Sequence, residues 1–228
     1  MRMSGSARAA FSRVQTEGHS QCAALGVSLR FATLHELLDV NKANAASWRP
    51  LLPIFSPHCN DIRPGTYICW LGYNENNEVV VTQAARLFNW KDTNFHEEAE
   101  SLRLFYQEPD RWRGKDESIE VTAPSACKIT GRVVYTGAHW VRPDYRGKGL
   151  TAITPRMVKA LAMTIWRVDF FTTIMAKDIF DRGVADRAGY WRSQWSVDLN
   201  NTPTGTFPAA LLWDYPEDFT VNVMEGRR

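Results

Sequence analysis

Hydrophobic positions recur along the first half of the chain with two spacings, that of a helix and that of a strand. After Thr33, apolar side chains follow helical spacing until Pro50 ends the pattern. Residues 66–73 and 79–88 are rich in β-branched and aromatic residues, and the polar segment 74–78 between them has turn chemistry. We therefore predict an amphipathic helix followed by a β-hairpin.

A second helix is predicted over residues 94–108. Asn94 can cap its start, and Glu97 stands three positions further on, as in a capping box. Residues 108–124 are polar and acidic, which predicts a loop.

The second half of the chain predicts a βαβ unit. Residues 128–141 form a long β-type run, and the apolar positions from Leu150 onwards lie on one helical face despite Pro155. Residues 169–176 then form a compact apolar strand. The remaining predicted elements are a short helix over 179–188 and two closing strands, 193–199 and 209–215.

The N-terminal segment, residues 1–29, is rich in Ser, Ala and Gly and contains three arginines. Its apolar residues form no continuous run of the kind found in signal peptides. No window of the chain has the roughly 20 apolar residues needed to cross a bilayer. We expect a partly disordered arm, with organelle targeting as a minor alternative, and a single domain over residues 30–228, because no repeat or linker supports a second one.

Composition and charge are those of an ordinary globular protein. The 228 residues are 44% hydrophobic, and 27 basic residues against 25 acidic ones leave a net charge of only +2. The whole molecule therefore lacks the charge of a general nucleic-acid or membrane-surface binder. Its four cysteines form no C-x-x-C pair, so we expect no metal site and a reducing, cytoplasmic environment.

The segment that carries recognisable chemistry lies between the long strand and the following helix. Glycines allow a tight turn that presents backbone N–H groups to an anion, and the helix start adds the positive end of its dipole. Residues 142–167 hold six basic side chains against Asp144 alone, so this stretch is basic in a nearly neutral chain. These features predict a polyphosphate ligand. The segment consists of Arg146, Gly147, Lys148, Gly149, Leu150 and Thr151.

Spacing argues against the common nucleotide motifs. In a P-loop the first glycine would stand at Arg142, and Lys148 would precede Ser or Thr rather than Gly149. The dinucleotide fingerprint is matched only weakly and late in the chain. A plain strand-to-helix turn with solvated basic residues is the structural alternative. The sequence does not favour nucleic-acid binding through residues 142–167, because no compact reading motif accompanies the charge.

The stretch VRPDYRGKGLTA resembles the acetyl-coenzyme-A signature of the GCN5-related N-acetyltransferases (GNAT superfamily), [QR]-x-x-G-x-[GA]. Arg146, Gly149 and Thr151 take its defined positions, and the later segment RAGYW, with Gly189 and Tyr190, is similar to the family's K-x-G-F turn. The order of predicted elements is similar too. The resemblance implies a mixed α/β acyl-CoA N-acyltransferase fold, a twisted and mostly antiparallel sheet with helices on both faces.

The resemblance also implies a function, an acetyl-CoA-dependent transfer of an acetyl group to an amine by direct attack. Val141, with Trp140 beside it, would hold the pantetheine arm, and the amides from Arg146 to Thr151 would hold the pyrophosphate. The thioester would lie where the strand ending at Val141 splays from the strand of residues 170–176. The amine acceptor is not identified, and a homodimer is common in the family.

Two side chains are candidates for proton transfer. His139 stands two residues before Val141 on the long strand, where an imidazole can act as a base, and Tyr190 can act as an acid. A packed strand histidine and a core tyrosine are the structural alternatives. The glutamates on the second predicted helix are alternative bases, although such a helix face is usually just solvated: Glu97, Glu98 and Glu100.

The family's usual tyrosine acid falls at Ala185, and an often-found asparagine falls at Asp178. The alternative function is therefore a catalytically degenerate module that binds coenzyme A or another ligand without turnover.

Overall fold

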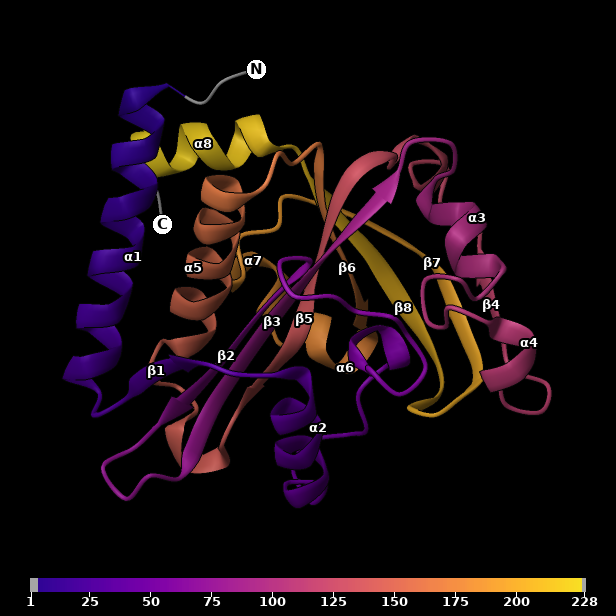
Figure 1. Ribbon diagram of the computed structural model, residues 1–228, viewed down its shortest axis with the longest axis horizontal. Coiled ribbons are helices and arrows are strands. Elements are labelled where there is room, and N and C mark those ends of the chain that lie inside the picture. Colours follow the sequence, from indigo (N-terminus) through magenta and orange to yellow (C-terminus); the bar gives the residue numbers. More distant parts are fainter. Residues whose placement is uncertain (1–3, 227–228) are drawn as a thin grey trace.

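The computed structural model describes residues 4–226 and contains an eight-stranded sheet with helices on both faces (Figure 1). The strand order is β1-β2-β3-β5-β6-β8-β7-β4. Every neighbouring pair is antiparallel except β5 and β6. This architecture confirms the mixed α/β fold with a mostly antiparallel sheet.

The strands and helices have the following bounds. The strands are β1 (Ser28–Phe31), β2 (Tyr67–Tyr73), β3 (Val79–Trp90), β4 (Ser118–Val121), β5 (Gly131–Val141), β6 (Phe170–Ala176), β7 (Arg192–Thr202) and β8 (Gly205–Asp214). The helices are α1 (Gly5–Ala24), α2 (Leu34–Ala43), α3 (Phe95–Glu100), α4 (Pro109–Trp112), α5 (Leu150–Ile165), α6 (Lys177–Phe180), α7 (Val184–Arg187) and α8 (Pro216–Met224).

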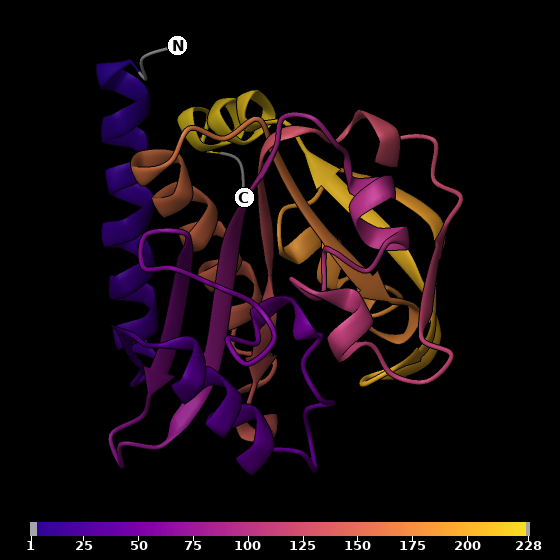
Figure 2. The same cartoon turned by 45° about the vertical axis from the view of Figure 1, so that its right-hand side comes forward.

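Alternate residues of the central strands face two separate cores. Val133 packs into the core beneath α2 and α3, whereas its neighbour Val134 packs into the core beneath α1, α5 and α8. The period of two along a strand produces this division. Figure 2 shows α1, α5 and α8 grouped together, away from α2 and α3. The sheet is therefore covered on both faces, as predicted.

The N-terminal segment differs from the sequence prediction. Residues 5–24 form α1, capped by the Ser4 side chain, instead of the partly disordered arm that we expected. The helix buries Phe11 in a stacked contact with Phe219 of α8. At Gly18 it approaches α5 so closely that a Cβ would lie 2.3 Å from the Met157 sulphur. Contacts distant in sequence therefore order this segment; residues 1–3 of the expected arm and 227–228 of the expected domain lie outside the described chain.

Three other expectations need correction. The second predicted helix ends at Glu100, because the chain turns at Leu102 with a left-handed φ of 62°. The predicted loop contains both α4 and the edge strand β4. The short helix over 179–188 is two single turns, α6 and α7, separated at Gly183, whose φ is 68°.

The βαβ unit and the β-hairpin are confirmed. β5 and β6 are parallel neighbours joined through α5, and α5 begins at Leu150 with Pro155 inside it. Proline has no N–H to give to the Thr151 carbonyl, and the helix continues past this lost bond. Among the helices of residues 4–226, none is long and apolar enough to cross a membrane.

Candidate functional site

The strands β5 and β6 form a fork at the centre of the sheet. They pair in parallel from Val133 and Phe170 to Tyr135 and Thr172, and the pairing stops there although both strands continue. Beyond this point the second half of β6 pairs with β8 on its other side. The final residues of β5 thus border an open edge within the sheet.

A β-bulge lies in the diverging part of β5. Thr82 of β3 pairs with Trp140 and Ala84 pairs with Gly137, so β5 holds one residue more than β3 between these pairs. Ala138 takes a left-handed φ of 50°, and its carbonyl accepts a 2.6 Å hydrogen bond from the Thr82 hydroxyl. A bulge bends its strand and increases the local twist, which favours the separation of β5 from β6.

Two tyrosine hydroxyls lie at the base of the fork, one on each face of the sheet. The Tyr190 hydroxyl lies 2.7 Å from the Thr136 hydroxyl and donates to the Thr172 carbonyl at 3.2 Å. The Tyr135 hydroxyl accepts a 3.2 Å hydrogen bond from the Ile174 N–H. These contacts engage backbone groups where the ladder between the strands has ended.

Burial keeps both phenols protonated. It raises the pKa of Tyr190 well above its ordinary value of 10 and raises the pKa of Tyr135 to about 12. Each side chain can therefore serve as a neutral donor at pH 7. Tyr190 was a candidate from the sequence, whereas Tyr135 was missed, because it is the third residue of an apolar run that begins at Val133 and has no polar neighbour before it in that run.

The predicted base His139 points from β5 onto α5. Its Nε2 lies 3.1 Å from the Thr151 hydroxyl, and its Nδ1 lies 3.5 Å from the Thr154 hydroxyl. Burial lowers the pKa of His139 to about 4, so the ring is neutral at pH 7. The imidazole is therefore a weak base on the α5 face of the sheet.

Trp140 lies on the opposite face from His139. The ring is only 4% exposed and stacks on Trp48, with 5.3 Å between ring centroids. Its Nε1 donates to the Ser47 hydroxyl at 3.3 Å. Trp140 therefore packs against the segment that follows α2.

The loop after β5 has the backbone geometry of an anion site. Gly147 and Gly149 have φ values of 78° and 89°, and no atom lies within 4 Å of the position that a Cβ would take at either residue. The buried Leu150 then begins α5; the Ala152 N–H donates to the Gly149 carbonyl at 2.9 Å, and the N–H groups of Leu150 and Thr151 precede the first bonds of the helix. The open space and the helix start together fit a phosphate group.

Basic side chains of the loop differ in their availability. Arg142 is bound by Asp144 and Glu78, with contacts of 2.7 and 2.8 Å. Lys148 lies over the Tyr145 ring, and Arg146 donates to backbone carbonyls rather than carboxylates. Arg146 and Lys148 are the residues whose charge is available to an anion.

The Val141 backbone faces the open edge of the fork. The N–H of the next residue, Arg142, donates to Val80 of β3 at 2.9 Å. Because hydrogen bonding alternates along an antiparallel strand, the polar groups of Val141 point away from β3. Its carbonyl instead accepts a 3.1 Å bond from Arg146 Nε. An extended ligand that displaces this side chain could bond to the strand here.

A groove of about 780 Å³ lies on the outer surface of α5 and reaches the loop at Gly149. Its walls come from α1, α7 and α8. Trp191, which is 59% exposed, lies at the α7 side of this groove. A large ligand held at the loop would find room here.

The segment Ser47–Arg49 joins both arms of the fork on the face opposite α5. Ser47 contacts Trp140 of β5, and its carbonyl accepts a 3.3 Å bond from Arg146. Arg49 forms an ion pair with Asp178 of α6, which directly follows β6. This segment therefore covers the end of the fork.

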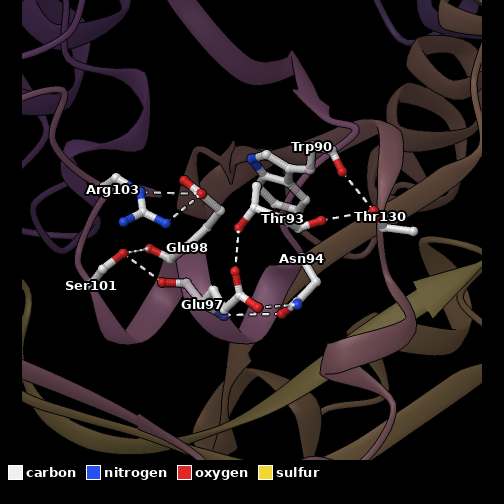
Figure 3. A network of polar contacts seen from close by, with 8 residues as sticks. All are labelled: Trp90, Thr93, Asn94, Glu97, Glu98, Ser101, Arg103 and Thr130. Atoms are coloured by element: carbon white, nitrogen blue, oxygen red, sulfur yellow. Dashed lines mark hydrogen bonds and ion pairs between the residues drawn. The ribbon is translucent and has the colours of Figure 1, made fainter.

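The glutamates of α3 have structural partners, and Figure 3 shows those of Glu97 and Glu98. Glu97 accepts hydrogen bonds from the Thr93 and Asn94 side chains, and Asn94 caps the helix by accepting from the Glu97 N–H. Glu98 pairs with Arg103 at 2.8 Å. Glu100 accepts from the Val121 N–H. These contacts fasten α3 and β4 rather than gather at the fork.

Comparison with known proteins finds similarity of structure only. No family model and no curated protein matches the chain. The spermidine N-acetyltransferase of Vibrio cholerae matches with a TM-score of 0.50 and 8% identity, over 85% of this chain and 96% of that one. A chimera of that enzyme with hSSAT gives a TM-score of 0.51 and 8% identity, over 85% and 98%. NAA60 of Arabidopsis thaliana, solved with acetyl-CoA, gives 0.48 and 14%, over 84% and 99%.

Proposed function

We propose that this chain, which has the fold of the GCN5-related N-acetyltransferases, transfers the acetyl group of acetyl-CoA to an amine. One observation carries the proposal: the open glycine loop at Gly147 and Gly149 lies at the end of β5, beside the fork between β5 and β6. An anion site and an open strand edge are thus adjacent. This combination suits a ligand with a pyrophosphate at one end of an extended arm.

The loop and the strand edge would share the binding of the coenzyme. The backbone N–H groups around Gly149 and the side chains of Arg146 and Lys148 would hold the pyrophosphate. The Val141 backbone would bond to the pantetheine arm once Arg146 turns from its carbonyl to a phosphate. The groove along α5 leaves space for the nucleotide end.

Acetyl-CoA would supply the activated acyl group, and the chain would supply orientation and proton transfer. Direct attack by an amine forms the amide bond and breaks the thioester bond; a base takes the ammonium proton, and the sulphur leaves as thiolate or thiol. Tyr190 is our candidate donor to the sulphur, because its hydroxyl is protonated and lies at the base of the fork, where the O–H would turn from the Thr172 carbonyl to the sulphur. The role of His139 as base stays a prediction.

The acceptor is an amine of unidentified structure, and the homodimer stays a prediction. The four cysteines are free thiols, which agrees with the cytoplasm as the predicted compartment. The chemistry of the acceptor will follow from an activity screen rather than from the fold.

A non-catalytic binding module is the second candidate. Ala185, which is 4% exposed, provides no hydroxyl at the position where the family resemblance places the acid. A thiol-release assay over polyamines, aminoglycosides and peptides separates the two candidates. Coenzyme binding without thiol release across this panel would favour the module.

Calorimetric titration with acetyl-CoA tests the site itself. We expect binding to the wild type and at least a tenfold weaker Kd for Gly149→Val, because a side chain forces the backbone out of its left-handed turn and fills the anion space. Gly65→Val is the matched control, since Gly65 has a φ of 86° and equally open surroundings. No binding to the wild type, or equal losses in both variants, would refute the proposed site.

A further inference from the structure

A buried ion pair joins α5 to the end of strand β8. Lys159 on α5 and Asp214 at the end of β8 are each only 1% exposed, with 3.0 Å between Nζ and Oδ2. Removing two charges from water is costly, and apolar residues of similar size often stabilise a core as well or better. The pair therefore needs an explanation other than stability.

Both members of the pair bind the turn that carries Tyr190. The Lys159 ammonium donates to the Gly189 carbonyl at 2.7 Å, and the Asp214 carboxylate accepts from the Trp191 N–H at 2.9 Å. The residues immediately before and after Tyr190 are thus fixed from two sides.

The Tyr190 ring itself lies against the same ammonium. Lys159 Nζ is 3.6 Å from the ring centroid, in the geometry of a cation–π contact. Backbone anchors on each side and a charge over the ring leave the side chain little freedom. The hydroxyl at its far end meets Thr136 and Thr172, the residues where β5 and β6 separate.

The turn also has backbone hydrogen bonds of its own. α7 is a single turn, and Gly189 after it has a left-handed φ of 69°. The Gly189 and Tyr190 N–H groups donate to the Asp186 and Ala185 carbonyls, each at 3.0 Å. The Lys159 and Asp214 side chains add anchors from α5 and β8 to these local bonds.

We propose that Lys159 and Asp214 are positioning residues for acyl transfer, which hold the Tyr190 hydroxyl at the fork between β5 and β6. This inference rests on the proposed function, in which Tyr190 donates a hydrogen bond to the leaving sulphur. Asp214 also lies 4.0 Å from Arg192 Nη1, and Lys159 Nζ lies 5.7 Å from the centroid of the Phe171 ring. The contacts with the turn and the ring are those through which the pair acts on Tyr190. We expect its effect mainly in the chemical step; since Gly189 and Trp191 also line the groove along α5, KM for acetyl-CoA is measured beside kcat.

The test compares Tyr190→Phe, the charge-free double variant Lys159→Met with Asp214→Leu, and the triple variant that combines them. Kinetics with acetyl-CoA and the best amine of the panel give kcat and KM separately. We expect kcat to fall about tenfold in Tyr190→Phe and in the double variant, with KM for acetyl-CoA within about twofold of wild type. The kcat of the triple variant should be no lower than that of Tyr190→Phe or of the double variant, because both changes remove the same interaction.

The matched control is a buried polar contact far from the turn. Tyr106 donates to both carboxylate oxygens of Glu117 at 3.0 Å. Tyr106→Phe should lower thermal stability while leaving kcat unchanged, both in the wild-type background and when it is added to Tyr190→Phe. The positioning role would be overturned if the fold-loss of kcat in the triple variant equalled the product of the losses in Tyr190→Phe and in the double variant. A double variant with wild-type kcat would overturn it as well.

Amide hydrogen exchange decides the positioning role without any turnover. The double variant should exchange the Trp191 N–H at least about tenfold faster than wild type, since its acceptor is gone. Unchanged exchange at Trp191 would overturn the proposal even in an active enzyme. A different result would be faster Trp191 exchange in the double variant together with a wild type that releases no thiol with any amine. That result would remove the proposed function, and with it the catalytic meaning of the pair.

Discussion

Arg49 donates from Nη2 to both carboxylate oxygens of Asp178, each at 3.1 Å, and so ties the segment after α2 to α6. That segment also contacts β5 through Ser47 and Trp140. Because α6 directly follows β6, the ion pair spans the two arms of the fork on the face opposite α5. An acceptor amine that enters from this face would meet the pair in its path.

Breaking this ion pair should ease acceptor entry at little cost in stability. Each partner is 44% exposed, and such pairs contribute about 0.5–1 kcal/mol at most. We expect Arg49→Gln to lower KM for the amine by roughly twofold to fivefold, the equivalent of that energy, with an unchanged Kd for acetyl-CoA. Steady-state kinetics and calorimetry measure the two quantities.

The control for Arg49→Gln lies on α6, the helix that carries Asp178. Lys177 of α6 pairs at 3.0 Å with Asp181, the residue that follows this helix, and does not reach across the fork. Lys177→Gln should leave KM for the amine unchanged. If both variants shift KM equally, the effect is one of surface charge, and the ion pair does not govern entry.

His139 should make the stability of the fold depend on pH. Its pKa is about 4 in the folded protein against an ordinary value of 6.5. Below pH 6.5 the unfolded chain binds a proton that the folded chain does not, so the free energy of unfolding falls as pH decreases from 6.5 towards 4. The loss from this group reaches roughly 3 kcal/mol.

Urea unfolding of wild type and His139→Gln between pH 7 and pH 4 measures this loss. Glutamine stays neutral, so the stability difference between wild type and variant should narrow or reverse as pH falls. His58→Gln, at an exposed histidine, is the control and should run parallel to wild type. If the free energy of unfolding of His139→Gln changes with pH in parallel with that of wild type, the His139 ring is not protected from protonation in the folded protein.

The central βαβ unit could be predicted because its signals are local. The apolar face that begins at Leu150 fixed the start of α5 despite Pro155, and the glycine loop followed from neighbouring residues. His139 and Trp140 are neighbours on β5 and face opposite sides of the sheet, as strand alternation requires. Each of these patterns is formed by residues that lie close together in the sequence.

The rest depends on contacts between distant parts of the chain. α1 has a weakly apolar face, and its order comes from packing on α5 and α8, which no local pattern reveals. Lys159 and Asp214 are 55 residues apart, so only the folded chain brings them together. Tyr135 reads as one aromatic residue in an apolar strand. Its place at the fork follows from where the pairing with β6 ends.

The close approach of α1 to α5 should be sensitive to any side chain at Gly18. A Cβ there would lie 2.3 and 2.5 Å from the Met157 sulphur and Cγ, in a core where Met157 is 1% exposed. We expect Gly18→Leu to lower the free energy of unfolding by about 1–3 kcal/mol through overpacking. Chemical denaturation measures the change.

Two further variants test the cause of that loss. Gly5→Leu, in the first turn of the same helix, has no atom within 4 Å of its Cβ position and should change stability by less than about 0.5 kcal/mol. Met157→Ala should partly rescue Gly18→Leu, because it vacates the space that the new side chain needs. An additive loss in that double variant would place the strain elsewhere.

The Lys159 and Asp214 pair should respond very differently to the loss of one partner and of both. Asp214→Leu alone leaves an ammonium buried without a carboxylate, so we expect a loss of about 3–5 kcal/mol in the free energy of unfolding. Adding Lys159→Met removes that charge and should restore most of the stability, as in other cores where a buried ion pair was replaced by apolar residues. Urea denaturation of the two single variants and the double variant gives the comparison. A double variant as unstable as Asp214→Leu would show that the ion pair is needed to stabilise the fold itself. Stability, rather than the position of Tyr190, would then explain why the two charges are buried.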